Sequence, residues 1–221
     1  MSTIGLFGKL PAHGDFISRH LPSSFISVWD EWLQLAVSGS RELQGDAWLD
    51  NYLTSPIWRF ALRSGAVNES AWVGILVPSV DSVGRYFPLT IALSLPASTN
   101  LFKYVAKKAV VFEALEAAAL STLQEQLDAD QLMSLLEGQV AAIQIEASSD
   151  LAVYEQGRVV SGGDDDAERY AGLLQHYFKG AASYSVWSAS ATANSPAATL
   201  VADGLPSVFQ YGSMLNGYWA E

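Results

Sequence analysis

The spacing of apolar side chains predicts a short strand and then two helices in the first quarter of the chain. Residues 2–7 have the pattern of the strand. Residues 22–37 favour a helix capped by Ser23 or Ser24, because large apolar side chains recur every three or four positions. These side chains are Phe25, Trp29, Trp32 and Ala36. Residues 45–53 show the same kind of spacing and predict a second, shorter helix.

The centre of the chain changes to the two-residue period that is typical of strands. Residues 57–63 alternate between apolar and other side chains, as expected of a strand with one solvated face. Residues 71–78 are apolar on both faces, which is typical of a strand between two covering layers. Residues 86–95 form a further strand-like run after the polar link at 79–85, so we expect an antiparallel hairpin.

Helical spacing returns after this hairpin. A long helix is predicted from the Ser-Thr-Asn triplet at 98–100 to Leu127, and a short helix follows Asp130 and ends at Gly138. Residues 140–146 and 151–157 resemble two short strands. Together these segments predict a helical stretch and then a small strand region in the third quarter of the chain.

Residues 165–180 carry the best-marked helix of the sequence. Asp165 and Glu168 match a capping box, and Lys179 with Gly180 is expected to close the helix. Its apolar stripe consists of Tyr170, Leu173, Leu174 and Tyr177. Two late strands and a terminal helix follow at 183–190, 198–202 and 205–215.

Strands interleaved with helices, around a sheet that is apolar on both faces, predict the α/β class. We expect a three-layer α/β/α sandwich around a mixed sheet, because the central hairpin is incompatible with a purely parallel one. No repeat of 20 to 50 residues and no long linker interrupts the pattern. Residues 1–221 are therefore expected to form a single domain.

Composition and charge narrow the classes of partner. The 12 basic and 23 acidic residues give a net charge of −11, which disfavours nucleic acid and anionic lipid surfaces. No apolar run approaches the roughly 20 residues that span a bilayer, so we expect no membrane insertion. The absence of cysteine, and an N-terminus without the features of a secretory leader, suit a cytoplasmic protein.

The common catalytic and cofactor motifs are absent from the sequence. Gly8 and Lys9 are followed by Leu10, and Thr3 occupies the first glycine position of a phosphate-binding loop, so a nucleotide site is not expected. No serine-hydrolase elbow and no zinc motif occurs. The acidic run at 164–168 could hold a hard cation, but the capping-box match favours acidic residues that stabilise a helix N-terminus. We therefore expect no metal and no cofactor.

Two polar loops hold the most specific candidate residues. The first loop contributes Lys9, Leu10, Pro11, Gly14, Asp15 and Phe16, and the second contributes Asp81, Gly84 and Arg85. Gly14 is suited to a left-handed turn, and Pro11 limits backbone freedom. The charged residues could form one ion-pair cluster that supports the loops, or a surface that contacts a partner. The sequence leaves both alternatives open.

The same segments, in order, resemble the TagF (ImpM) family of type VI secretion-associated proteins. The resemblance is carried by FGKLPAHGDF, WLQLA, YLTSPIWRFAL, WVGILVPSVDSVGRYFPLTIA, YSVWSAS and GLPS. It is densest over residues 7–93, whereas residues 97–180 agree only in the order of their elements. The two loop motifs, with a tryptophan-rich helix between them, make the combination distinctive.

The resemblance implies regulation and no catalysis. It implies a cytoplasmic, post-translational repressor of type VI secretion that acts through a forkhead-associated scaffold protein of the apparatus. It also implies a three-layer α/β/α fold, and it carries over no catalytic residue. The alternative from the residues themselves is a small hydrolase-like enzyme that uses His13 with Asp15 or Asp81 in a cleft at the loop edge.

Overall fold

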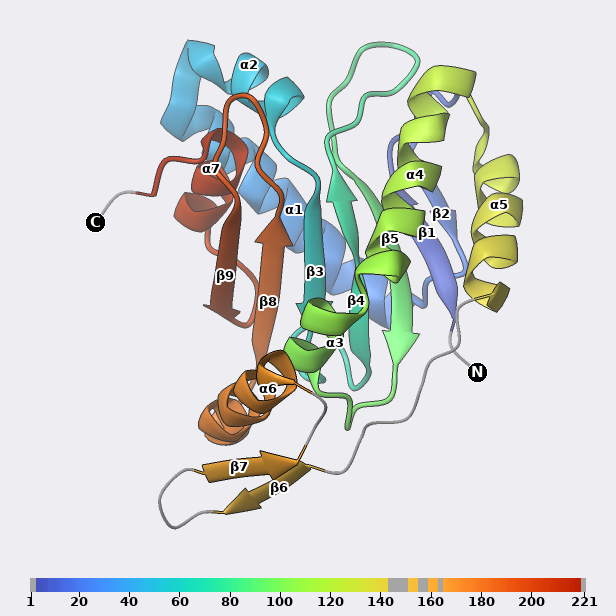
Figure 1. Ribbon diagram of the computed structural model, residues 1–221. Helices are drawn as coiled ribbons and strands as arrows, with labels where there is room; N and C mark the ends of the chain where they lie inside the picture. The colour runs from blue at the N-terminus through green and yellow to red at the C-terminus, as the bar shows by residue number, and fades with distance from the viewer. Residues whose placement is uncertain (1–2, 143–150, 155–158, 163–164, 220–221) are drawn as a thin grey trace.

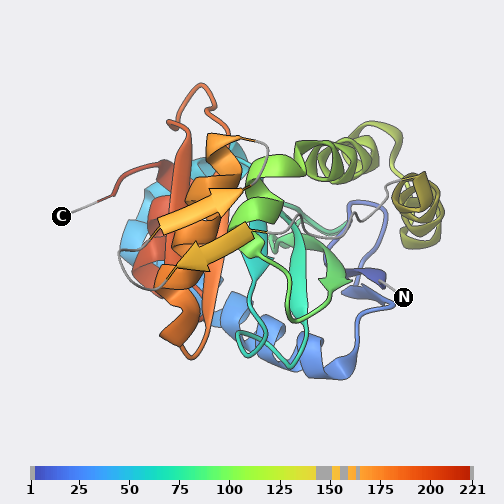
Figure 2. The same cartoon turned by 60° about the horizontal axis from the view of Figure 1, so that its bottom comes forward.

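A computed structural model describes residues 3–142, 151–154, 159–162 and 165–219, and within these ranges it contains one large and one small sheet (Figure 1). The large sheet contains, in spatial order, β2 (Ile17–Arg19), β1 (Ile4–Gly8), β5 (Leu89–Leu95), β4 (Ala71–Val77), β3 (Trp58–Leu62), β8 (Tyr184–Ala189) and β9 (Ala198–Asp203). The small sheet pairs β6 (Leu151–Tyr154) with β7 (Val159–Gly162), and it lies beside α6 (Asp166–Tyr177) (Figure 2).

Every strand pairing between described residues is antiparallel, so the expected mixed sheet is wrong. Short connections join β3, β4 and β5 into a meander, and β1 and β8 add to its two sides in antiparallel register. The apolar pattern of residues 71–78 misled the prediction, because a strand buried on both faces has the same pattern in either kind of sheet. The coarse expectation of mixed helices and strands around an open sheet is confirmed.

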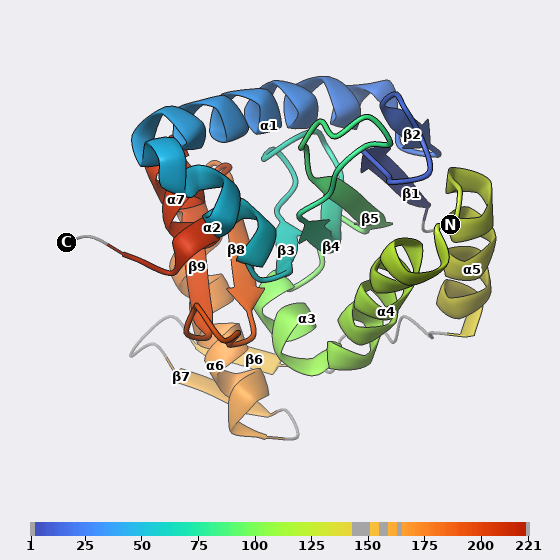
Figure 3. The same cartoon turned by 90° about the horizontal axis from the view of Figure 1, so that it is seen from above.

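Helices lie along both faces of the large sheet (Figure 3). One face carries α1 (Ser23–Gln44), α2 (Trp48–Thr54) and α7 (Val208–Asn216), and the other carries α3 (Leu101–Lys107), α4 (Ala109–Glu125) and α5 (Ala129–Ala142). Short 3-10 turns at Gly45–Ala47 and Phe178–Gly180 extend the helical segments. All seven residues of β4 are buried, because this central strand packs against helices on each side.

A cluster of aromatic side chains fastens α1 to the sheet. The Trp29 ring lies parallel to Trp187, with centroids 6.1 Å apart, and its centroid is 5.0 Å from that of Phe60. Burial of an indole leaves its N–H in need of an acceptor. The Trp29 Nε1 group donates to Thr90 Oγ1 at 2.8 Å, so helix and sheet are joined by a buried hydrogen bond as well as by packing.

The helix start and several later boundaries differ from those expected. Neither Ser23 nor Ser24 caps α1; Pro22 is the N-cap residue, and its side chain makes no capping hydrogen bond. The predicted long helix is divided at Lys108 into α3 and α4. Residues 140–142 of an expected strand belong to α5, and the remainder of that segment lies outside the described residues.

The predictions for residues 151–157 and for residues 165–180 are each confirmed only in part. Residues 151–154 form β6, and residues 155–157 lie outside the described part. Asp165 caps α6 by accepting from the Glu168 amide. The buried side of α6 consists of Glu168, Ala171 and Gly172, whereas the expected apolar stripe is largely exposed at Tyr170, Leu174 and Tyr177.

The hydrogen bond between Trp29 and Thr90 yields a stability prediction. Replacing Thr90 by Val removes the acceptor and leaves the Trp29 N–H buried without a partner, which is expected to lower the free energy of unfolding by about 1–3 kcal/mol. Urea unfolding measures this change. In a Trp29→Phe background, Thr90→Val should lower the free energy of unfolding by less, because the indole N–H is then absent. Equal losses in both backgrounds would show that the hydrogen bond does not contribute to stability.

Candidate functional site

The two candidate loops meet at one end of the large sheet because of its strand directions. β1 and β4 each pair with β5 in antiparallel fashion, so β1 and β4 run the same way and end at the same edge. The loop at 9–16 follows β1 and the loop at 78–88 follows β4. Figure 3 shows these loops beside α1, and we call the surface that they form the loop corner (residues 9–16 and 78–88).

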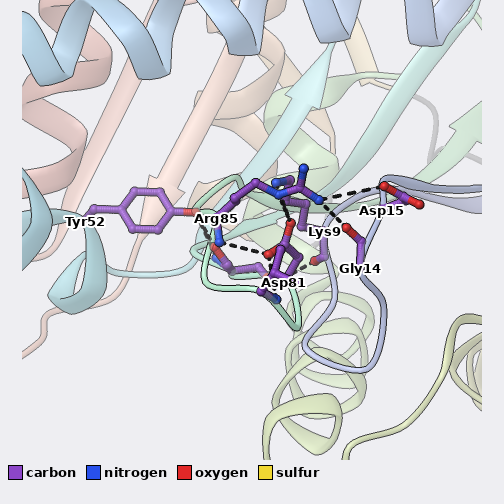
Figure 4. Close-up of polar contacts among 8 residues, drawn as sticks. Lys9, Gly14, Asp15, Tyr52, Asp81 and Arg85 are labelled. Atoms are coloured by element: carbon purple, nitrogen blue, oxygen red, sulfur yellow. Dashed lines mark hydrogen bonds and ion pairs between the residues drawn. The ribbon is translucent and has the colours of Figure 1, made fainter.

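The carboxylate of Asp81 is the polar centre of the loop corner (Figure 4). Its side chain is completely buried, and its Oδ2 accepts from Lys9 Nζ at 2.7 Å and from Arg85 Nε at 2.7 Å. Its Oδ1 accepts from the amides of Arg85 and Val83 at 2.8 Å and 3.1 Å. A single buried carboxylate therefore binds one cation from each loop and orders its own turn.

The hydrogen bonds to Asp81 keep it ionised. Burial by itself would raise the pKa of this carboxyl, because a low dielectric disfavours the charged form. The hydrogen bonds from Lys9, Arg85 and the Val83 amide outweigh that effect and hold the pKa of Asp81 well below its ordinary value of 3.8. The Lys9–Asp81 contact is thus an ion pair with almost no access to water.

Backbone groups of the two loops are also joined directly. The Ser79 hydroxyl donates to the Lys9 carbonyl at 2.7 Å, and the Ser82 amide donates to the His13 carbonyl at 2.9 Å. From α2, the buried Tyr52 hydroxyl donates to the Ser79 carbonyl and accepts from the Ser79 amide, both at 2.9 Å. Burial raises the pKa of Tyr52 well above its ordinary value, so the hydroxyl stays protonated for this role.

Glycine is required at two positions in this region, and neither is Gly14. Gly8 has a φ of +130°, and a Cβ there would lie 2.0 Å from the Pro88 carbonyl oxygen, so the strands approach closely at this point. Gly84 has a φ of +86° in the turn of the second loop. Gly14 does not adopt a positive φ, so the expected left-handed turn is wrong there; its carbonyl oxygen instead accepts from the Arg85 guanidinium.

The outer surface of the loop corner contains Asp15, Phe16 and the guanidinium of Arg85. Asp15 is fully exposed, with Oδ1 3.8 Å from the Arg85 guanidinium. Phe16 is 51% exposed, although its ring packs edge-on against Phe87 with centroids 4.8 Å apart. The Lys9 ammonium lies 5.1 Å from the Phe16 ring centroid, so the buried cation makes a cation–π contact with the partly exposed ring.

The remaining candidates of the first loop are directed inward. Leu10 is completely buried in the core on the α4 side of the sheet, and Pro11 is half-buried in the turn that the Leu10 carbonyl closes with the His13 amide. His13 Nε2 accepts from the Ala129 amide at 3.0 Å, at the start of α5. His13 therefore links the first loop to α5, and in this geometry its acceptor nitrogen is already engaged.

The three groups considered for acid–base chemistry are each engaged or exposed in a different way. Asp81 is surrounded by donors, Asp15 faces solvent, and His13 is bonded to a helix amide. Within the described ranges, no group of three or more His, Cys, Asp or Glu side chains could hold a metal ion. Sequence reasoning missed Tyr52 and Ser79 as parts of this network. Ser79 lies in the polar link at 79–85 and Tyr52 in the predicted helix at 45–53, and neither pattern signals the hydrogen bonds between them.

Comparisons with known proteins agree with the sequence resemblance. The family model of the TagF N-terminal domain, described as type VI secretion system-associated, matches residues 5–138. The crystal structure of PA0076 from Pseudomonas aeruginosa PAO1 is 35% identical in sequence, with a TM-score of 0.79. The similarity covers 99% of this chain and 96% of that chain. Among curated proteins, none matches this sequence significantly.

The lowered pKa of Asp81 yields a prediction about pH. Because the folded-state pKa lies below the ordinary value of 3.8, the stabilisation is present above about pH 4 and is lost as the pH falls below it. Asp81→Asn should unfold more easily than the wild type at pH 7, and the difference should shrink between about pH 4 and pH 2. Denaturant unfolding across this range measures it; a constant difference would contradict the ionised pair.

Proposed function

Because this chain belongs to the TagF family of type VI secretion-associated proteins, we propose that it is a post-translational negative regulator of type VI secretion. It acts by binding a forkhead-associated scaffold protein of the apparatus, in the cytoplasm, and not by catalysis. The loop corner is the surface through which it binds. None of the helices in the described ranges combines the length and apolar character that a bilayer span requires.

The exposed side chains above a buried ion pair are the observation that carries this proposal. Lys9 and Asp81 are almost entirely buried, and together with Arg85 they hold both loops in one conformation. Above them, Phe16 is half exposed and Asp15 is fully exposed. A rigid surface that presents an aromatic ring and charged groups loses little conformational entropy on binding, which favours tight association with another protein.

The layered packing supports the same role. We take the fold as a three-layer α/β/α sandwich, with α1, α2 and α7 over one face of the sheet and α3, α4 and α5 over the other. Recognition loops are commonly carried on a rigid scaffold of this kind. The loop corner is tied to both outer layers, since Tyr52 of α2 bonds Ser79 and His13 bonds the first turn of α5.

Binding to the purified forkhead-associated scaffold tests this function. Asp15→Lys and Phe16→Ser alter exposed side chains and leave the Lys9–Asp81 pair in place, so the protein should remain folded. Each is expected to weaken the complex by about tenfold or more, as for an interface residue worth about 1.4 kcal/mol. Biolayer interferometry measures the dissociation constants.

Glu125→Lys is the matched control. Glu125 is exposed at the end of α4, which covers the face of the sheet opposite to α1. This control should bind like the wild type. The same variants should show whether overproduction of the protein still suppresses the release of type VI substrates into the medium. Undiminished binding by both loop variants, with intact folds, would remove the loop corner from the contact surface, and a wild-type protein that does not bind the scaffold would overturn the proposed partner.

A further inference from the structure

An open groove lies between the outer side of α1 and the loop corner. One wall is formed by Phe16 and Phe87, and the other by side chains of α1 between Ser27 and Glu42. We infer that this groove, the α1 groove, binds a positively charged segment of a partner protein that inserts an apolar side chain beside Phe16. The inference rests on the proposed function only in taking that partner to be the one that the loop corner binds.

The apolar part of the α1 groove consists of side chains that the fold leaves uncovered. The inner side of α1 is occupied by Phe25, Trp29 and Leu33, which are completely buried against the sheet. Leu35 therefore faces outward and is 59% exposed. Phe16, on the wall opposite α1, packs against Phe87 and is 51% exposed. An aliphatic or aromatic side chain of a partner would remove both from water.

The charge of the groove argues for a basic occupant. Among the described residues that line it, Asp30, Glu31 and Glu42 are acidic and Arg41 alone is basic, which gives 1 − 3 = −2. The Arg41 guanidinium lies over the ring of Trp48, 5.4 Å from the centroid, and is thus already engaged with α2. At the loop corner, the exposed Asp15 carboxylate lies 3.8 Å from the Arg85 guanidinium, so this pair adds no net charge to that of the groove. Lysine or arginine side chains would complement this surface, whereas an acidic segment would be repelled.

The length of the groove sets the size of a suitable ligand. Ser27 to Glu42 spans 15 residue steps of α1, or about 22 Å at 1.5 Å per residue. An extended peptide covers that distance with about seven residues. A short basic segment is therefore sufficient.

A pair of synthetic peptides tests the inference without an identified partner. One fluorescein-labelled peptide of about eight residues carries lysines around a central phenylalanine, and its counterpart carries glutamates at the same positions. We expect saturable binding of the lysine peptide, weakened as salt rises, and no binding of the glutamate peptide in fluorescence polarisation. Equal binding of the two peptides, or no saturable binding of the lysine peptide, would overturn the inference.

Charge reversal locates the binding site. Glu31→Lys with Glu42→Lys should weaken binding of the lysine peptide by about tenfold or more. The control is Glu69→Lys with Glu125→Lys, which changes the net charge equally at exposed positions outside the groove. It should change the affinity by no more than about twofold. Equal losses in the two double variants would mean that only overall charge is sensed, which contradicts a site in the groove.

The scaffold protein then separates this inference from the proposed function. If the wild type binds the scaffold and Glu31→Lys with Glu42→Lys binds it much more weakly, the α1 groove is part of that interface. If this double variant binds the scaffold as well as the wild type does, the assignment of the partner to the groove is wrong. A wild-type protein that binds the lysine peptide but not the scaffold would leave the groove as a basic-segment site and would overturn the proposed partner.

Discussion

A single buried carboxylate, that of Asp81, holds the two loops of the loop corner together. Asp81 accepts hydrogen bonds from Lys9 of the first loop and from Arg85 of its own loop, so separating the loops after β1 and β4 breaks the Lys9–Asp81 ion pair. Removing one partner of such a pair is costly, because the remaining charge has no access to water. These contacts join the two loops of the loop corner, with Asp15 and Phe16 exposed on its outer side.

The fold supplies the conditions for this constraint. The antiparallel order β1-β5-β4 brings the ends of β1 and β4 to one edge, and the two helical layers bury the sheet on either side. Gly8 permits the close approach to Pro88 that aligns the first loop with the second. α1, anchored by the aromatic cluster around Trp29, places its acidic outer side next to the same corner. Loop corner and α1 groove thus form one continuous surface.

The sequence predicted those parts of the structure that depend on local periodicity. The tryptophan stripe of α1 and the hairpin of β4 and β5 follow from side-chain spacing alone. Beyond this hairpin the strand directions could not be predicted, since a strand buried on both faces, such as β4, has the same apolar pattern in a parallel and in an antiparallel sheet. The α6 stripe failed because Ala171, Gly172 and an ion-paired Glu168 form the contact with α3, which depends on tertiary packing. Within the candidate site, the sequence predicted the charged pairs. The roles of Tyr52, Ser79 and the Gly14 carbonyl could not be predicted, because they depend on contacts between residues that are distant in sequence.

Hydrogen–deuterium exchange of the protein with and without the forkhead-associated scaffold would locate the contact surface. In the complex we expect slower exchange of amides in residues 9–16 and 78–88 and along α1, with little change in α4 and α6. Protection confined to α4 or α6, with unchanged exchange at the two loops, would contradict a contact through the loop corner.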